Sequence, residues 1–107
     1  MDETRRTQVI ENLRGMGLTQ ALISDPMSIY YLTGYYTEPY ERFLGLYLSA
    51  SGASTLFANR LFPDASTACE DIRTFDDTED PVPLVAAVTD HNAPLGVDKK
   101  LSARWLV

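Results

Sequence analysis

The stretch FLGLYLSASGASTLFA, residues 43–58, decides the fold of this chain. Its first part, residues 43–49, is almost continuously apolar, which is the pattern of a strand that is covered on both faces. The small residues ASGAS predict a turn into a second strand over 54–58. We expect the two strands to pair as a hairpin, within a sheet that carries helices on both sides.

Helices and strands alternate along the rest of the chain. The expected elements are a helix over 4–16, a strand over 21–24, a helix over 26–32, a helix over 62–70, a strand over 72–76, a helix from 81 to about 91, a strand over 94–98 and a helix that begins after Ser102. This order predicts an α/β fold with a mixed β-sheet of about five to six strands, flanked by helices on both faces.

Local signals fix several helix ends. The first helix has a predicted apolar stripe formed by Val9, Ile10, Leu13 and Met16. In the second helix, Asp25 is expected to accept a hydrogen bond from the amide of residue 27 or 28, because Pro26 supplies the first helical position. Gly34 is expected to end that helix.

Composition and charge exclude several classes of protein. A chain of 107 residues with 45% apolar and 22% charged residues is typical of one globular domain. No apolar run approaches the roughly 20 residues of a membrane span, and the start lacks a secretory signal, so we expect a cytoplasmic protein. The net charge of -6 argues against nucleic acid, since the only adjacent basic pairs are Arg5-Arg6 and Lys99-Lys100.

Side chains for catalysis are scarce. The single Cys69 rules out an intrachain disulfide and a cysteine metal site, and it is expected to be a small buried apolar residue. The single His91 has no accompanying nucleophile elbow, and we expect it near a helix C-terminus. The acidic run 76–80 is expected to be a solvated loop, because it lacks the glycine and the later glutamate of an EF-hand.

Three segments, in this order, resemble the N-terminal domain of the creatinase, prolidase and aminopeptidase P family. They are ENLRGMGLTQALISDPMSIYYLTGY, ERFLGLYLSASGASTLFA and LGVDKKLSARWL. The resemblance implies the creatinase/prolidase N-terminal fold, with its ribonuclease H-like motif. It also implies that the complete protein is a metallopeptidase acting on Xaa-Pro peptides, as a dipeptidase or an aminopeptidase.

The metals of such a peptidase are expected outside this chain. In the family, two divalent ions, usually manganese, cobalt or zinc, are held by a C-terminal pita-bread domain. The segment SARWLV starts a helix that has no C-cap, so we expect residues 1–107 to be a fragment from which the catalytic domain is missing. The chain itself is then expected to hold no catalytic, metal-binding or cofactor-binding residue and to be inert alone.

The resemblance also assigns an interface. Family members are dimers or tetramers, and the loop after the Tyr-Leu-Thr-Gly motif leans over the active site of a neighbouring subunit. The motif is Tyr31, Leu32, Thr33 and Gly34, and the loop runs over 35–42. The resemblance therefore implies a homo-oligomer whose interface or substrate border contains Tyr35, Tyr36, Glu38, Tyr40, Glu41 and Arg42.

The local pattern divides the tyrosine-rich stretch 29–43 into two parts. Ile29, Tyr30, Tyr31 and Leu32 are expected to pack on the sheet as core. Tyr35, Tyr36 and Tyr40 lie in a polar segment and are expected to be exposed for a partner or substrate. Glu41 and Arg42 are expected to form a surface ion pair.

Two alternative functions are compatible with parts of this sequence pattern. The same fold occurs in creatine hydrolases and in non-enzymatic peptide-binding or histone-binding relatives, and residues after 107 would distinguish them through the five metal ligands. A freestanding nucleotide-binding domain is disfavoured, because neither Gly-x-Gly-x-x-Gly nor a Walker-type loop occurs.

Overall fold

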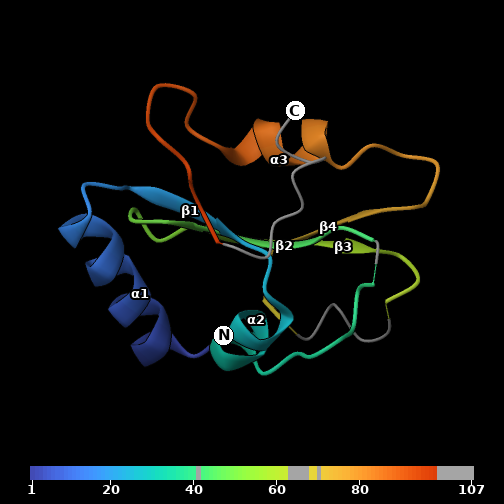
Figure 1. Cartoon of the computed structure of the whole chain (residues 1–107), viewed down its shortest axis with the longest axis horizontal. Coiled ribbons are helices and arrows are strands. Elements are labelled where there is room, and N and C mark those ends of the chain that lie inside the picture. Colours follow the sequence, from blue (N-terminus) through green and yellow to red (C-terminus); the bar gives the residue numbers. More distant parts are fainter. Residues whose placement is uncertain (41, 63–67, 70, 99–107) are drawn as a thin grey trace.

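The computed structural model of the chain describes residues 1–40, 42–62, 68–69 and 71–98 (Figure 1). Within these residues the elements are α1 (Glu3–Gly15), β1 (Gln20–Ile23), α2 (Pro26–Thr33), β2 (Leu44–Ser49), β3 (Ser54–Asn59), β4 (Asp71–Phe75), α3 (Val82–Val88) and β5 (Gly96–Val97). The predicted helix 62–70 falls largely outside the described residues, and so does the predicted helix after Ser102.

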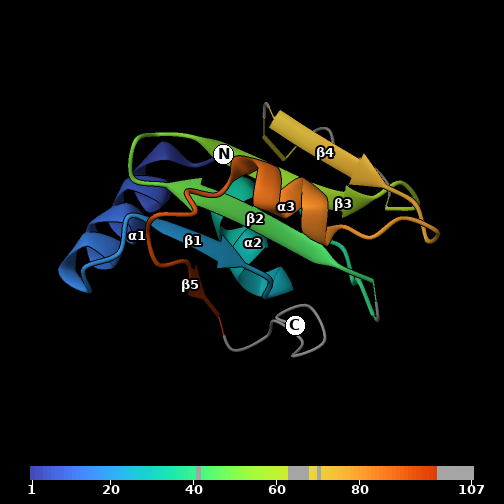
Figure 2. The ribbon, with the colours of Figure 1, turned by 90° about the horizontal axis from the view of Figure 1, so that it is seen from above.

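The described strands form a five-stranded mixed sheet in the order β4-β3-β2-β1-β5 (Figure 2). The predicted hairpin is confirmed, because β2 and β3 pair antiparallel with Leu46 opposite Leu56. β2 also pairs antiparallel with β1, whereas β5 adds parallel to β1 and β4 adds parallel to β3. The predicted fold class is confirmed.

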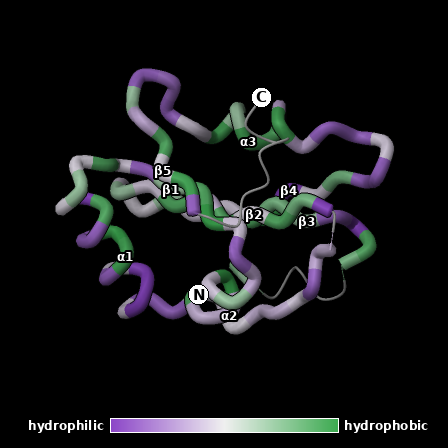
Figure 3. The backbone as a smooth tube through the Cα atoms, in the orientation of Figure 1, coloured by the Kyte–Doolittle hydropathy of each residue, from purple (hydrophilic) through white to green (hydrophobic). Residues whose placement is uncertain are grey.

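Helices cover both faces of the sheet. α1 and α2 lie on one face and α3 lies on the other (Figure 1). Successive residues of a strand point to opposite faces. Leu46 therefore packs in the hydrophobic cluster between the sheet and α2, which we call the cluster under α2. Tyr47 and Phe57 pack in the hydrophobic cluster between the sheet and α3, which we call the cluster under α3. This explains why residues 43–49 are almost continuously apolar, and Figure 3 shows hydrophobic colour on the strands of the sheet and on α3, which covers one face.

The buried side of α1 differs from the predicted stripe. Ile10 and Leu13 are buried as expected, but Met16 is 67% exposed because α1 ends at Gly15. The buried set includes Arg6, whose Nε donates to Ser54 Oγ at 2.8 Å. Arg6 therefore ties α1 to the start of β3 by a polar contact that an apolar pattern does not reveal.

The start of α2 also differs from its prediction. The Asp25 side chain makes no capping bond to a backbone amide. Its Oδ2 accepts instead from the Ser28 hydroxyl at 2.9 Å, which lies three residues along and competes with the amides. A second carboxylate fixes this corner, because Asp98 Oδ2 accepts from the backbone N–H groups of Ser24 and Asp25 at 2.7 and 2.8 Å.

A buried amide ends α3 earlier than predicted. The helix begins as expected beside Asp80, whose Oδ1 accepts from Val82 N at 3.0 Å, but it stops at Val88 and not near residue 91. The reason is Gln20, which is 1% exposed and binds the chain that follows the helix. Gln20 Oε1 accepts from Asp90 N at 2.9 Å, and its Nε2 donates to the carbonyls of Asp90 and Ala93 at 2.8 and 3.0 Å.

Among the residues that the structure describes, no helix has the length and apolar character needed to cross a bilayer.

Candidate functional site

The Tyr-Leu-Thr-Gly motif shapes the chain where α2 ends. Thr33 Oγ1 donates to Ile29 O at 2.7 Å and accepts from Tyr35 N at 3.1 Å. Gly34 adopts a left-handed conformation, with φ of 78°, and its N–H donates to Tyr30 O at 2.8 Å. Gly34 ends the helix as predicted, and the motif turns the following segment back under the sheet.

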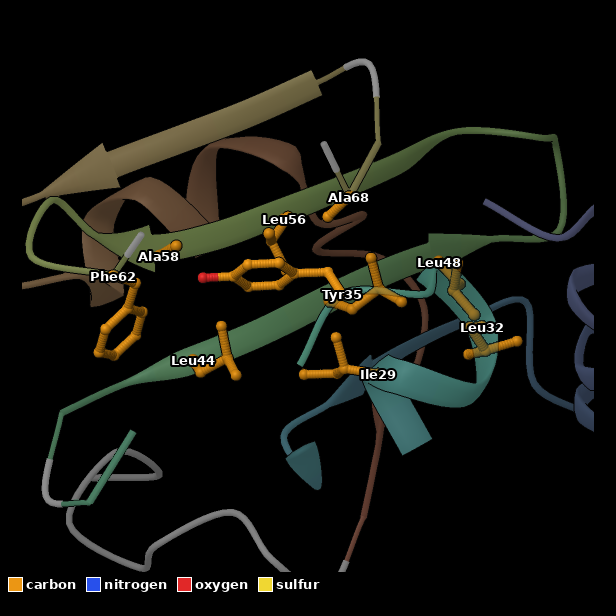
Figure 4. Packing of buried hydrophobic residues seen from close by; sticks show 10 residues of the cluster. Ile29, Leu32, Tyr35, Leu44, Leu48, Leu56, Ala58, Phe62 and Ala68 are labelled. Atoms are coloured by element: carbon orange, nitrogen blue, oxygen red, sulfur yellow. The ribbon is translucent and has the colours of Figure 1, made fainter. Parts of the chain in front are cut away.

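Tyr35 is core, so the prediction that it lies on an exposed surface is wrong. It is 7% exposed and belongs to the cluster under α2. In Figure 4 its ring lies between Leu44 and Leu56, among the other labelled side chains of this cluster. The physical reason is the left-handed turn at Gly34, which directs the next residue inward.

Tyr30 and Tyr31 show the opposite error, because they were predicted to be core and are 48% and 52% exposed. A helix buries only one stripe, and residues three apart share it, so Ile29 and Leu32 occupy the side that faces the sheet. Tyr31 instead packs under the guanidinium of Arg5, 4.2 Å from the ring centroid.

The exposed large side chains of α2 and the next segment form what we call the aromatic surface. Its members are Met27, Tyr30, Tyr31, Tyr36 and Tyr40. Tyr40 is 82% exposed and Tyr36 is 49% exposed, as expected for both. The rings of Tyr30 and Tyr36 meet edge to face, with centroids 6.2 Å apart.

Glu38 lies next to Tyr36 in this segment. The Tyr36 hydroxyl donates to Glu38 Oε2 at 3.3 Å. The negative charge of Glu38 raises the pKa of the Tyr36 hydroxyl, with smaller contributions from burial and from this hydrogen bond. The hydroxyl therefore stays protonated at neutral pH and remains a hydrogen-bond donor.

Arg42 pairs with Asp77, which no sequence pattern suggested. Its Nε donates to Asp77 Oδ1 at 3.0 Å and its Nη2 donates to Asp77 Oδ2 at 3.1 Å, so the ion pair is bidentate. The Nδ2 of Asn59, the last residue of β3, donates to the same Oδ1 at 2.7 Å. Glu41, the predicted partner of Arg42, lies outside the described residues. The sequence analysis missed this cluster, and Asn59, a polar residue at the end of an apolar strand, is the signal that could have indicated it.

The acidic run 76–80 is exposed, but the prediction that it is only solvated is wrong. Besides the contact of Asp77 with Arg42, the guanidinium of Arg60 lies 3.3 Å from both Asp76 and Glu79. β3 and β4 are parallel neighbours, so the loop that follows β4 lies beside the end of β3, where Arg60 is located. Arg42 and Arg60 can therefore both reach its carboxylates.

The described side chains do not fit a divalent metal centre. No three His, Cys, Asp or Glu side chains within the described ranges converge in a way that could hold an ion. The Sγ of Cys69 donates to Asp71 O at 3.2 Å, and burial raises the pKa of this half-buried thiol. His91 is exposed, with Nε2 2.7 Å from Ala86 O. No catalytic step is therefore assigned to these groups.

A separate open cleft of about 660 Å³ lies at the opposite end of the sheet, between α1, β2 and the end of α3. Its lining includes Arg14, Gln20, Tyr47 and Asp90. Two of these polar groups are already used by the fold, since the Tyr47 hydroxyl donates to Gln20 Oε1 at 2.8 Å and Gln20 binds the chain after α3. The aromatic surface and the Arg42 cluster are therefore the stronger candidate site.

The Asp77 carboxylate should titrate at low pH. The hydrogen bond from Arg42, followed by that from Asn59, lowers its pKa from the ordinary aspartate value. Because the folded pKa is the lower one, the stabilisation is present above the ordinary pKa and is lost as pH falls through the folded pKa. In Arg42→Gln the pKa of Asp77 should rise toward its ordinary value, which NMR of the carboxyl carbon would measure. Identical titrations in both proteins would contradict the contact.

Comparison with known proteins supports a common origin. The sequence profile described as Creatinase/Prolidase N-terminal domain matches residues 5–105. The creatinase/prolidase N-terminal domain of an X-Pro dipeptidase from Streptococcus pyogenes shares the fold with a TM-score of 0.83 and 28% identity, over 98% of this chain and 84% of that one. A dipeptidase from Pyrococcus horikoshii OT3 gives a TM-score of 0.79 and 26% identity, over 95% of this chain and 30% of that one.

A curated relative is much longer than this chain. An uncharacterized peptidase of Staphylococcus aureus is 32% identical over 84 residues, which are 76% of this chain and 24% of that peptidase. The chain thus spans about a quarter of the length of the curated relatives that it matches. The sheet order, the profile match and these structural similarities lead to one conclusion: the chain belongs to the creatinase/prolidase N-terminal domain family.

Proposed function

We propose that residues 1–107 are the non-catalytic N-terminal part of a metal-dependent Xaa-Pro dipeptidase or aminopeptidase that acts in the cytoplasm. The similarity to an X-Pro dipeptidase domain supports the substrate class, and the greater length of the curated relatives supports a separate catalytic domain. The two divalent metals of the reaction, manganese, cobalt or zinc, would be bound by that domain. The residues described here would contribute contacts and no chemical step.

The observation that carries the proposal is the aromatic surface beside the Tyr-Leu-Thr-Gly motif. Exposed tyrosines are rigid and amphipathic, and they are enriched at protein interfaces. Here, large exposed side chains gather on α2 and the next segment while Ile29, Leu32 and Tyr35 hold that segment to the sheet. We infer that this surface contacts a second subunit of a homo-oligomer.

The same segment would border the substrate of the neighbouring subunit. Tyr36, Glu38, Tyr40 and Arg42 supply a phenolic donor, a carboxylate, an exposed ring and a guanidinium within one short segment. These groups suit the polar ends and the proline ring of an Xaa-Pro dipeptide. Tyr35 is excluded from this role because it is buried.

The test uses the complete polypeptide with Tyr36→Ser and Tyr40→Ser combined. Light scattering should show a smaller assembly than the wild type, and KM for an Xaa-Pro dipeptide with added manganese should rise about tenfold, which is the loss of about 1.4 kcal/mol of binding. Met16→Ser is the matched control, because Met16 is an exposed apolar residue outside the aromatic surface.

Two outcomes would contradict the proposal in different ways. An unchanged molecular mass and KM in the double variant would rule out the interface. A wild-type polypeptide that does not hydrolyse any Xaa-Pro dipeptide, with manganese, cobalt or zinc, would rule out the enzyme class.

A further inference from the structure

The segment after α2 passes from one face of the sheet to the other. Tyr35 belongs to the buried cluster under α2, and Phe43 belongs to the buried cluster under α3. Between these two buried rings the side chains of Tyr36 and Tyr40 are exposed. The two rings fix the ends of the segment, so any further control over its exposed part has to come from contacts made between them.

One tight turn lies in this crossing. Arg42 N donates to Pro39 O at 2.9 Å, and Pro39 is buried. Tyr40 has φ of 51°, a left-handed conformation that is uncommon for a residue other than glycine. A strained residue persists only where its surroundings hold it, and the turn leaves the Tyr40 side chain 82% exposed.

The contact that holds the turn comes from residues far along the chain. Asp77 accepts from both Nε and Nη2 of Arg42, and it also accepts from Asn59 Nδ2. Asn59 is 2% exposed and is fixed at its other end, because its Oδ1 accepts from Leu61 N at 2.9 Å. The carboxylate is thus bound to the rigid end of β3, and Arg42 is bound to the carboxylate.

We propose that Asp77 is a positioning residue, which together with Asn59 holds Arg42 and thereby fixes the turn that presents Tyr40. The inference rests on the proposed function for its consequence: Asp77 sets the orientation of the substrate-bordering segment without touching substrate. An isolated exposed ion pair contributes little. This carboxylate differs from such a pair, because its removal also leaves the buried amide of Asn59 without its acceptor.

Amide hydrogen exchange on the 107-residue chain tests whether Asp77 holds the turn. In Asp77→Ala the backbone amides of Tyr40 and Arg42 should exchange about fivefold faster, because the turn opens more often. Arg42→Ala should give a similar increase, and the double variant should give no more than either alone, since both remove one contact. Glu11→Ala, which removes an exposed carboxylate from α1, is the control. Unchanged exchange in Asp77→Ala, or fully additive effects, would overturn the proposal.

Kinetics of the complete polypeptide test whether Asp77 orients the segment that borders the substrate. Asp77→Ala should raise KM for an Xaa-Pro dipeptide about fivefold with kcat changed less than about twofold, and Asp77→Glu should recover most of the loss. Faster exchange with an unchanged KM would overturn the positioning role. A wild-type protein without Xaa-Pro hydrolysis would instead overturn the proposed function, and the exchange experiment would still decide whether Asp77 holds the turn.

Discussion

Replacing Phe57 by alanine should lower the free energy of unfolding by about 4 kcal/mol. Phe57 is fully buried in the middle of β3 and packs with Phe43, Tyr47 and Phe75 under α3. It lies opposite Gly45 in the β2–β3 pairing, where the absence of a side chain leaves room for the neighbouring ring of Phe43. Truncation would therefore leave a cavity bordered by side chains from several strands, which the sheet cannot close.

Urea denaturation monitored by circular dichroism would measure this loss. Phe57→Leu is the matched variant and should cost less than about 1.5 kcal/mol, because it retains most of the volume. Leu61→Ala removes an exposed apolar side chain and should change stability by less than about 0.5 kcal/mol. If Phe57→Ala were as stable as Phe57→Leu, the packing described under α3 would be wrong.

Replacing Gln20 by methionine should cost about 3 kcal/mol, although the two side chains have similar size and methionine is apolar. The Gln20 amide binds the Tyr47 hydroxyl, the N–H of Asp90 and the carbonyls of Asp90 and Ala93. Methionine would leave these partly buried partners without the Gln20 amide, which is itself 1% exposed. The segment that carries the chain from α3 to β5 would then loosen.

Gln8→Met is the matched control, since it makes the same change at an exposed position of α1 and should shift stability by less than about 0.5 kcal/mol. Tyr47→Phe combined with Gln20→Met should be less than additive, because both changes remove the 2.8 Å hydrogen bond. Equal stabilities of Gln20→Met and Gln8→Met would contradict the role of the buried amide. Urea denaturation monitored by circular dichroism would also measure the free energy of unfolding of these variants.

The order of elements could be predicted because it follows from local patterns. An almost continuously apolar run, as in 43–49, is typical of a strand that is covered on both faces. The small residues after it close the hairpin, and Asp-Pro pairs precede both α2 and α3. Each of these signals acts within a few residues, so the sequence carries it in full.

The burial of the tyrosines could not be predicted from local sequence patterns. Four consecutive residues, 29–32, all favour burial by type, yet a helix of eight residues on one face of a sheet can bury only positions three or four apart. Which stripe faces the sheet depends on how α2 docks. The conformation of Gly34 then decided that Tyr35 turns inward while Tyr36 turns out.

By itself, the sequence determined the hairpin, the α/β class and the motif segments that indicate the family, because periodicity and turn residues act over short distances. Only the tertiary structure decided that Arg42 meets Asp77, that Gln20 binds the chain after α3 and that Arg6 reaches Ser54. These partners lie 35, 70 and 48 residues apart along the chain. With 15 acidic residues available to nine basic ones, no pattern in the sequence selects one such pair. The pairing is fixed by where the ends of the strands meet in space.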